Sequence, residues 1–390
     1  MIRVLMIAYT DYTNDARVRR HAEALALRGD HVDVIALDTT KCGSLNGVNV
    51  IAVEIPRYRG SSRARYLSTY ARFFSSASFI GLRGGFSERY DLVIVCTMPD
   101  AAIISAIPLK LLGSKVLLDI HDTMPEIYLD KFGGRGGAFG ARLLMAQERI
   151  CAALADRVIA VHEPHRARLM LSGIPENKIA VILNSPDNET FFPTSLPPND
   201  NAAEFSIVCH GLISRRLGVD VAVEAMSLIR DRVPAARLTV IGDGEGLARA
   251  KSLAAALDLT DRVRFLGRVP LDHLPQILTQ ESVGLVPNRA SETTHLMLPV
   301  KLLEYAALRI PTIAARLRTI EYYFDRDAVR FFNPGQPADL ADAIEELWRY
   351  PDRRAALARS AERVLAQLNG PTQRANYYRT IDSLLGNVIA

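Results

Sequence analysis

Short, nearly continuous runs of Val, Ile and Leu alternate with longer amphipathic stretches along the chain. In the first half, such runs predict strands at 2–8, 31–37, 48–54, 90–96, 115–120, 157–161 and 178–183. Runs that are apolar at almost every position are typical of parallel strands buried on both faces. The stretch 14–28 has helical spacing and ends at Gly29. The pattern therefore predicts a βαβ series, which folds as a doubly wound sheet.

The segment 187–204 interrupts this pattern, because it gathers prolines among Asn, Asp and Ser and is typical of a linker. After it, the pattern predicts strands at 205–209, 237–241, 263–266, 283–286, 312–314 and 329–332, and helices at 218–230, 246–257, 340–350 and 373–385. We expect two α/β, Rossmann-like domains, 1–186 and 205–370, facing each other across a cleft. The segment 371–390, which follows a break at Gly370-Pro371, should pack back on the first domain. Ligands bind at the carboxyl ends of parallel strands, so that cleft is the expected site.

Composition narrows the class of protein. The 390 residues are 49% hydrophobic and 23% charged, as in globular proteins, and a net charge of +4 does not by itself indicate nucleic-acid binding. None of the four cysteines lies in a Cys-x-x-Cys pair, so no zinc or dithiol site is predicted. The chain begins with a strand-like run, and its longest apolar stretch, 101–112, is too short to span a bilayer. We expect a cytoplasmic enzyme.

The stretch Leu298-Pro-Val-Lys-Leu-Leu-Glu follows a predicted strand and a polar loop. Lys301 and Glu304 are three residues apart and share one face of a predicted helix. The N-terminus of a helix binds phosphate through its free N–H groups and its dipole, and Lys301 would add a full positive charge. Glu304 could accept hydrogen bonds from two ribose hydroxyls. The alternative is an ordinary exposed ion pair between these two side chains.

Two further loops of the second domain follow strands directly. In the first, His210 to Asp220, Gly211 permits close approach of the backbone and Arg216 could bind a diphosphate through its guanidinium. The other loop, 242–246, contains Asp243 between two glycines and weakly resembles a dinucleotide-binding turn. A surface arginine and a glycine turn without function are the alternatives.

In the first domain, the strand at 115–120 turns polar at once at His121 and Asp122, and Glu126 follows. These side chains could hold sugar hydroxyls or an acceptor at the cleft, or they could be a satisfied histidine and a capping aspartate. The loop after the first strand, which contains Asn14 and Arg17, lies over the same edge, and Asn14 or Asp15 is expected to cap the helix that follows.

Together, these stretches resemble the retaining GT-B glycosyltransferases of glycosyltransferase family 4, over residues 1–361. The similarity lies in short motifs whose order and spacing match: Asp15-Ala-Arg-Val-Arg, Asp119-Ile-His-Asp-Thr-Met-Pro-Glu, Asp156-Arg-Val-Ile-Ala-Val-His-Glu-Pro, Val181-Ile-Leu-Asn-Ser-Pro-Asp, Leu238-Thr-Val-Ile-Gly-Asp-Gly, Phe265-Leu-Gly-Arg-Val and Leu298-Pro-Val-Lys-Leu-Leu-Glu-Tyr.

The resemblance implies a role for individual residues. Arg216 and Lys301 would bind the donor diphosphate and stabilise the leaving group, and Glu304 would hold the ribose. His121 would lie near the transferred sugar. Donor binding would also involve Gly211, Asp243 and Leu298, and the acceptor side would involve Asn14, Arg17, Asp122 and Glu126. The resemblance implies a nucleotide-diphosphate-sugar donor, transfer with retention, and no metal or other cofactor.

Three features depart from the family pattern. The family often has a glutamate eight residues before Glu304, a position that is Leu296 here, so the identity of the sugar is open; Glu292 is a possible substitute. The usual Gly-Arg…Lys-Gly of the phosphate loop is Gly211-Leu…Leu-Gly218, which places the arginine role on Arg216. The glycine pair of the first loop is replaced by Thr13-Asn14-Asp15.

Other classes of protein compete with this interpretation. A nucleotide-sugar epimerase would require acid pairs in the cleft, and a phosphorylase a pyridoxal lysine; neither is evident. A dehydrogenase would require a Gly-x-Gly-x-x-Gly after the first strand, yet residues 9–14 contain no glycine. A non-catalytic protein that binds sugar nucleotides stays open because of Leu296.

The segment 57–89 is strongly basic. Its charged residues are seven arginines and Glu88, a net charge of +6, and seven aromatic residues are mixed among them. Basic and aromatic residues on one helix suit the surface of an anionic membrane. We therefore expect a peripheral enzyme at the inner face of the cell membrane, acting on a polyprenyl-diphosphate-linked sugar. The alternative is an ordinary helix whose aromatic residues face the core.

Overall fold

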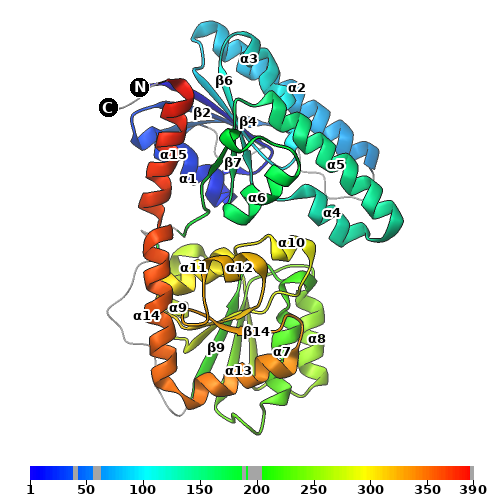
Figure 1. Ribbon diagram of the computed structural model, residues 1–390, viewed down its shortest axis with the longest axis vertical. Helices are drawn as coiled ribbons and strands as arrows, with labels where there is room; N and C mark the ends of the chain where they lie inside the picture. Colours follow the sequence, from blue (N-terminus) through cyan, green and yellow to red (C-terminus); the bar gives the residue numbers. More distant parts are fainter. Residues whose placement is uncertain (38–42, 56–62, 187–189, 192–203, 387–390) are drawn as a thin grey trace. The chain divides into compact units, whose positions relative to one another are not determined.

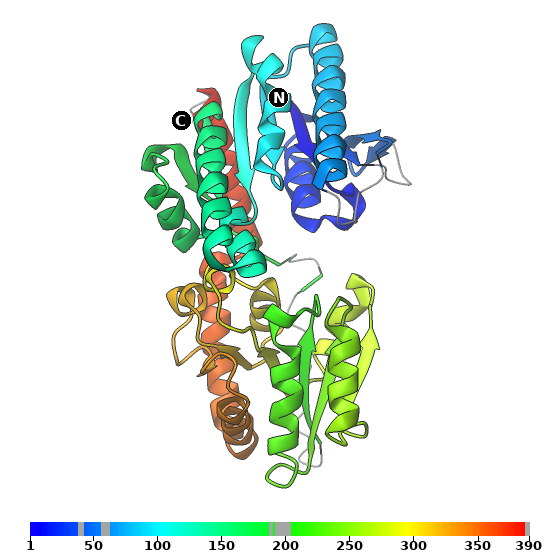
Figure 2. The same cartoon turned by 90° about the vertical axis from the view of Figure 1, so that its right-hand side faces the viewer.

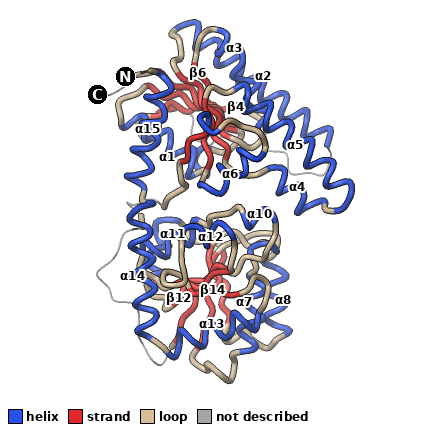
Figure 3. Tube along the Cα trace, in the orientation of Figure 1, coloured by secondary structure: helices blue, strands red, loops and turns tan. Residues whose placement is uncertain are grey.

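The computed structural model describes residues 1–37, 43–55, 63–186, 190–191 and 204–386 (Figure 1). The chain divides into two units. Unit 1 comprises Met1–Asn184 and Gln373–Ala390, and unit 2 comprises Ser185–Thr372. Most of the predicted linker, and Arg57 and Arg59 of the basic segment, lie outside the described residues. Each unit contains one sheet with helices packed around it (Figure 3), which confirms the prediction of two Rossmann-like α/β folds.

Unit 1 is built on sheet A, in which eight strands follow the order β3-β4-β2-β1-β5-β6-β7-β8. The strands are β1 (Arg3–Ala8), β2 (His31–Leu37), β3 (Gly43–Leu45), β4 (Val48–Val53), β5 (Leu92–Cys96), β6 (Lys115–Ile120), β7 (Arg157–Ala160) and β8 (Ile179–Val181). Seven of them run parallel, and β3 pairs with β4 in the antiparallel sense. The carboxyl ends of the parallel strands therefore meet at one edge.

Helices cover both faces of sheet A (Figure 2). They are η1 (Tyr12–Asn14), α1 (Ala16–Leu27), α2 (Arg63–Ser87), η2 (Asp100–Ala106), α3 (Ile107–Leu111), α4 (Met124–Phe132), α5 (Gly134–Leu154), α6 (Glu163–Leu171), η3 (Glu176–Lys178) and α15 (Gly370–Leu385). On one face, α2, η2, α3 and α5 bury apolar side chains such as Phe73 and Ala152 against the sheet. On the other face, α1 and α15 bury Val18 and Ile381.

The C-terminal helix α15 is held to α1 by specific contacts. Arg28 forms an ion pair with Asp382 at 2.9 Å, and the Tyr378 hydroxyl donates to the Ala24 carbonyl at 2.6 Å. The ring of Tyr377 stacks on His21, with 4.4 Å between ring centroids. Helix α15 therefore completes the core of unit 1.

Unit 2 is built on sheet B, with six parallel strands in the order β11-β10-β9-β12-β13-β14. The strands are β9 (Phe205–His210), β10 (Ala236–Ile241), β11 (Val263–Gly267), β12 (Val283–Val286), β13 (Thr312–Ala315) and β14 (Arg330–Phe332). The helices are η4 (Arg215–Leu217), α7 (Val219–Leu228), α8 (Leu247–Ala256), η5 (Leu271–His273), α9 (Leu274–Leu278), α10 (Glu292–His295), α11 (Val300–Ala307), α12 (Arg318–Tyr323), α13 (Pro337–Arg349) and α14 (Pro351–Leu368).

Close packing of α11 on sheet B fixes the position of the first residues of this helix. A Cβ on Gly284, in the middle of β12, would lie 2.6 Å from the ring of Tyr305, so only glycine fits there. Tyr305 is completely buried. The helix is thereby held directly over the strand.

Most predicted strands match the observed ones to within two residues, but the C-terminal helices differ. The sequence pattern did not reveal α14. The break expected at Gly370-Pro371 lies one residue earlier, at the extended Asn369 between α14 and α15, and Gly370 and Pro371 begin α15. Proline is tolerated in the first turn of a helix because its missing N–H has no partner there anyway. No helix among the described residues is both long and apolar enough to cross a membrane.

Candidate active site

Lys301 lies in the first turn of α11 and points toward the loop after β9. It is only 9% exposed, its Nζ lies 3.9 Å from Cys209 Sγ, and its Cε lies 3.8 Å from the position that a Cβ on Gly211 would occupy. Within the described part of the chain, no ion pair joins Lys301 to Glu304, whose carboxylate is instead paired with His210. The alternative of an ordinary exposed pair is therefore wrong. A buried ammonium group without a carboxylate partner is suited to an anionic ligand.

Glu304 is held by a histidine that the sequence pattern did not single out. His210, the last residue of β9, has its Nε2 2.6 Å from Glu304 Oε2 and its Nδ1 2.9 Å from the Tyr305 hydroxyl. The Tyr305 hydroxyl also donates to the Val208 carbonyl. This network leaves Glu304 Oε1 without a hydrogen-bond partner among the described residues. The place of His210 at the carboxyl end of a predicted strand was the signal that could have found it.

Glycines let the loops after β9, β10 and β12 pack backbone to backbone. A Cβ on Gly242 would lie 1.9 Å from the Gly211 carbonyl oxygen, and a Cβ on Gly218 would lie 1.8 Å from that of Pro287. Gly218 also adopts a φ of 69°, which favours glycine. The glycines of 242–246 therefore let this turn pack against the backbone of the loop after β9, and this packing explains their pattern without a dinucleotide.

Arg216 lies in η4 and is half-buried, and no ion pair links its guanidinium to an acid in the described part of the chain. Two buried polar side chains next to it lack hydrogen-bond partners: Ser214 Oγ, two residues earlier, and both polar atoms of the Asn288 amide, whose neighbour Arg289 donates its backbone N–H to the Arg216 carbonyl. Asn288 is completely buried and follows β12. Buried polar groups are normally paired, so these groups mark where a ligand or water would bind.

The two other predicted donor residues contribute less directly. Asp243 lies at the carboxyl end of β10, and its Oδ1 accepts a hydrogen bond from the Gly244 amide at 2.7 Å, so it shapes its own turn. Leu298 packs against the core of unit 2, just before α11. Pro299 is the N-cap residue of α11 and directly precedes its first turn.

In unit 1, a buried carboxylate gathers three partners at the carboxyl edge of sheet A. Asp119, at the end of β6, is completely buried and lies 2.5 Å from the Arg17 guanidinium. It also lies 3.2 Å from His21 Nδ1 and 3.0 Å from His121 Nε2. Burial alone would raise the pKa of Asp119, but Arg17 and His121 hold it well below its usual value. Burial lowers the pKa of His21 to about 4, so this ring is neutral at pH 7.

The predicted acceptor-side residues separate into paired and exposed groups. Arg17 is buried and neutralised by Asp119, so its guanidinium is not exposed at the sheet edge. His121 is more accessible, with 14% of its side chain exposed, and Asp122 beside it is exposed. Asn14 ends η1 and bonds to Asp11, whereas Asp15 caps α1 by accepting from the Val18 amide.

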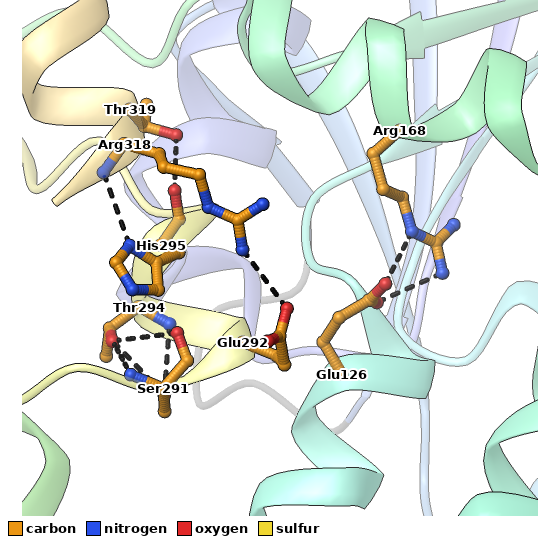
Figure 4. Close-up of polar contacts among 8 residues, drawn as sticks. All are labelled: Glu126, Arg168, Ser291, Glu292, Thr294, His295, Arg318 and Thr319. Atoms are coloured by element: carbon orange, nitrogen blue, oxygen red, sulfur yellow. Dashed lines mark hydrogen bonds and ion pairs between the residues drawn. The ribbon is translucent and has the colours of Figure 1, made fainter.

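Glu126 belongs to a second cluster of charged residues, of which Figure 4 draws Glu126 and Arg168. Arg168 donates to both oxygens of Glu126, at 2.6 and 3.0 Å, and also to Glu148. Burial raises the pKa of Asp100 to about 7, and the nearby Glu148 carboxylate adds to this. Both oxygens of Glu126 therefore accept from Arg168, so Glu126 positions this guanidinium.

Three groups of unit 1 have the spacing of metal ligands. One ligand atom each from Cys96, Asp119 and His121 lies within 4.8 Å of the others. Burial raises the pKa of Cys96 well above its usual value, so the thiol keeps its proton, and the thiolate is the form that binds metals. Arg17 already supplies a positive charge to Asp119. The donor set fits a charge-paired cluster better than a cation site.

The position of the missing glutamate lies beside α10. Leu296 ends this helix, and Glu292 at its start is 62% exposed and paired with Arg318 at 3.1 Å (Figure 4). Ser291 and Thr294 cap the helix through reciprocal hydrogen bonds. Burial lowers the pKa of the nearby His295, whose Nδ1 accepts from the Arg318 amide. Glu292 therefore lies in the short helix that directly precedes position 296, but in a solvated ion pair.

The described part of the basic segment has aromatic residues both in the core and at the surface. Residues 63–87 form α2, and Tyr70, Phe73 and Phe74 pack in or against the core. Phe79 and Phe86 are instead 66% and 76% exposed. Part of the aromatic content therefore builds the core, and part faces solvent beside exposed arginines.

Comparison with known proteins agrees with this architecture. Residues 15–185 match the family model described as glycosyl transferase 4-like domain, and residues 204–350 match glycosyl transferases group 1. The chain is 28% identical over 192 residues to a phosphatidylinositol N-acetylglucosaminyltransferase component of Arabidopsis thaliana, covering 49% of this chain and 41% of the relative. It is 30% identical over 174 residues to a GDP-mannose-dependent alpha-(1-6)-phosphatidylinositol monomannoside mannosyltransferase of Mycobacterium tuberculosis, covering 44% and 45%. The matched part is less than half of each relative.

Solved structures share the whole fold. Sucrose-phosphate synthase of Thermosynechococcus elongatus aligns with a TM-score of 0.79 at 18% identity, covering 99% of this chain and 100% of that one. HepE of Anabaena, solved in complex with UDP, aligns with a TM-score of 0.74 at 17% identity, covering 98% and 100%. Together, the family models and the fold place the chain among the GT-B glycosyltransferases.

Proposed function

We propose that the protein transfers a sugar from a nucleotide-diphosphate-sugar to an acceptor with retention of configuration, in the assembly of a cell-surface polysaccharide or glycolipid. The observation that carries this proposal is the buried Lys301 at the start of α11, which has no carboxylate partner among the described residues. A buried cation at a helix N-terminus can stabilise the negative charge that develops on a diphosphate leaving group.

The donor would occupy the edge of sheet B around Gly211. Lys301 and Arg216 bind the diphosphate, and the backbone after β9 approaches it through Gly211. Glu304 accepts the ribose hydroxyls through its open Oε1, while His210 fixes the orientation of the carboxylate. HepE was solved with UDP and with UDP-glucose, which supports a nucleotide-sugar as the ligand class.

For the chemical step, Arg216 and Lys301 stabilise the departing diphosphate. The bond between the anomeric carbon and the diphosphate breaks, the acceptor oxygen bonds to that carbon from the same side, and the proton of the acceptor hydroxyl passes to the departing phosphate oxygen. The resemblance assigns His121 to the transferred sugar and Asp122 and Asn14 to the acceptor side. The residues that carry these roles are cations and hydrogen-bond donors rather than a metal-binding set, so we propose a reaction without metal. His121 is held at Nε2 by Asp119, which leaves Nδ1 to face a substrate.

The proposed acceptor is a sugar on a polyprenyl diphosphate, reached by a peripheral enzyme at the inner face of the cell membrane. Support comes from the names of relatives, two of which act on phosphatidylinositol-based lipids, and a third, WcaL of Escherichia coli, is a putative colanic acid biosynthesis glycosyltransferase. The exposed Phe79 and Phe86 on α2, beside exposed arginines, are suited to such a location.

A donor screen tests the proposal. Thermal unfolding with nucleotide-sugars of each common base should reveal one that raises the unfolding temperature, since a ligand of the folded state stabilises it. Release of nucleoside diphosphate from that donor should increase on addition of acceptor and persist in EDTA. The coupling constant of the anomeric proton in the product tests retention. A donor that binds but releases nothing with any acceptor would instead indicate a non-catalytic binding protein.

A further inference from the structure

Helix α5 carries an apolar stripe on the side that faces solvent. The helix buries Ala141 and Ala152 against unit 1. On its opposite side, Phe139, Leu143 and Ile150 are 73%, 63% and 63% exposed. Their spacing of four and seven residues places all three on one side of a helix with 3.6 residues per turn. Helix α5 therefore has two apolar faces. One of them packs against unit 1, and the other faces solvent.

Arginines flank this stripe. Arg142 and Arg149 are exposed and lie seven residues apart, so they share one edge of it, and Arg135 continues the same spacing in the sequence. The one acidic residue of α5, Glu148, is completely buried against Arg168. The solvent-facing side of α5 therefore presents apolar and positively charged groups without a described acid.

Helix α2 carries exposed apolar and basic side chains on the same side of sheet A as α5. Both α2 and α5 pack against η2, on the same face of sheet A (Figure 2). Phe79 and Phe86 are exposed on α2, beside the exposed Arg72 and Arg83. We define the interfacial face as Phe79, Phe86, Phe139, Leu143 and Ile150 together with Arg72, Arg83, Arg142 and Arg149.

We propose that the interfacial face binds the surface of an anionic lipid bilayer, with the α5 stripe inserted at the level of the headgroups. Apolar residues flanked by arginines gain from both the acyl boundary and the negative surface potential. A second copy of the same face would bring arginines against arginines, and like charges oppose such pairing. Charge complementarity therefore selects the lipid over a dimer.

This inference rests on the proposed function only for its purpose, which is to bring the enzyme to a lipid-linked acceptor. It places the membrane contact on α5 as well as on the basic segment. The composition of α5 does not reveal this contact, because its arginines are not clustered. Binding to vesicles requires no donor, acceptor or turnover. The binding test can therefore fail while the sugar transfer succeeds, and the reverse.

The test is flotation of the full chain with vesicles of phosphatidylcholine alone or mixed with phosphatidylglycerol. Binding should require phosphatidylglycerol and weaken as salt is added. A Phe139→Ser/Leu143→Ser/Ile150→Ser variant should lower the partition coefficient at least roughly tenfold. An Arg142→Gln/Arg149→Gln variant should lower it by about tenfold or more.

Matched controls replace exposed residues of the same types elsewhere. Leu27→Ser/Leu171→Ser/Leu228→Ser removes three exposed leucines, and Arg359→Gln/Arg363→Gln removes two exposed arginines of α14. Both controls should float as the unmodified protein does. Thermal unfolding confirms that each variant is folded, and donor binding should be unchanged in all of them.

Three results would overturn the inference. The protein could ignore phosphatidylglycerol vesicles at low salt. It could bind them equally well after the α5 substitutions, which would place the contact elsewhere. Light scattering could also show a dimer that the serine variant converts to a monomer, which would make the stripe an interface between copies.

Discussion

The carboxyl edges of sheet A and sheet B use similar strands but distribute charge in opposite ways. At sheet A, Asp119 is surrounded by Arg17, His21 and His121, so its charge is compensated within the protein. At sheet B, Lys301 and Arg216 have no acidic partner among the described residues, and Glu304 is paired only through one oxygen. We call the edge of sheet A closed, because its charges are compensated within the protein. We call the edge of sheet B open, because Lys301 and Arg216 have no acidic partner among the described residues.

This difference indicates where binding energy is available. A compensated cluster stabilises and orients the groups around it, and it gains little from an anion. Uncompensated buried cations recover their desolvation cost only when a ligand of opposite charge arrives. Substitutions in the closed cluster should therefore affect stability, whereas substitutions at the open edge should affect donor binding and rate.

The largest effect is expected for Asp119→Ala. Removing this carboxylate leaves Arg17 buried without a partner, which should lower the free energy of unfolding by about 3–5 kcal/mol. Chemical denaturation measures the change. Asp122→Ala, at the exposed neighbouring position, should change stability by less than about 0.5 kcal/mol. Equal stability of the two variants would mean that the cluster is not closed.

The next largest effect is expected for Lys301→Ala, and it should appear in rate rather than stability. Loss of a contact to the leaving diphosphate should lower kcat/KM by about 10²–10³-fold, by analogy with other preorganised charge-stabilising groups. Glu304→Ala should lower donor affinity, since it removes the ribose contact. Lys251→Ala, on the exposed side of α8, should leave turnover unchanged. Normal turnover of Lys301→Ala on the true donor would refute the site.

A smaller, pH-dependent effect is expected for Asp100→Asn. The Asp100 carboxyl has a usual pKa of 3.8, which burial raises to about 7 in the folded protein. Between these values the folded state binds more protons, so this group makes the free energy of unfolding fall as pH rises from about 4 to 7. The variant should lack this component and gain stability over the native protein toward pH 8. Denaturation at several pH values tests it, with the exposed Asp272→Asn as the control that should keep the native profile.

The smallest effect on stability is expected for Glu292→Ala. Its ion pair with Arg318 is solvated on both sides, and such pairs contribute about 0–1 kcal/mol. If Glu292 substitutes for the glutamate missing at position 296, the variant should still lose affinity for the donor sugar while keeping affinity for the free nucleoside diphosphate. Unchanged affinity for both ligands would assign Glu292 to the surface only.

The strands could be predicted from the sequence because parallel strands that are buried on both faces consist of nearly continuous runs of aliphatic residues. Strands β2, β6 and β12 begin and end where the pattern placed them. The antiparallel β3 was missed because its three residues include a glycine and a serine and carry no apolar pattern. Helix α14 was missed because small and charged residues dominate its sequence, and its few buried positions give a weak signal.

The sequence could single out candidates from their local position: His121 directly follows a strand, and Lys301 and Glu304 share one face at the start of a helix. The partners of these residues could not be singled out, because they come from distant parts of the chain. Glu304 depends on His210, ninety-four residues away, and Arg168 engages Glu126 from forty-two residues away. The exposure of the α5 stripe could not be predicted from the sequence either, since its apolar residues and the nearby arginines look like those of any amphipathic helix.

The sequence by itself therefore determined two α/β halves and the strand ends that carry polar chemistry, because burial on both faces imposes an apolar run and a loop must follow it. Only the tertiary structure decided which charges are compensated. Arg17 and Lys301 are both buried cations near strand ends, yet one lies 2.5 Å from a carboxylate and the other lies beside a thiol and a glycine. Electrostatic interactions depend on distance in space, and the spacing of residues along the chain does not contain that distance.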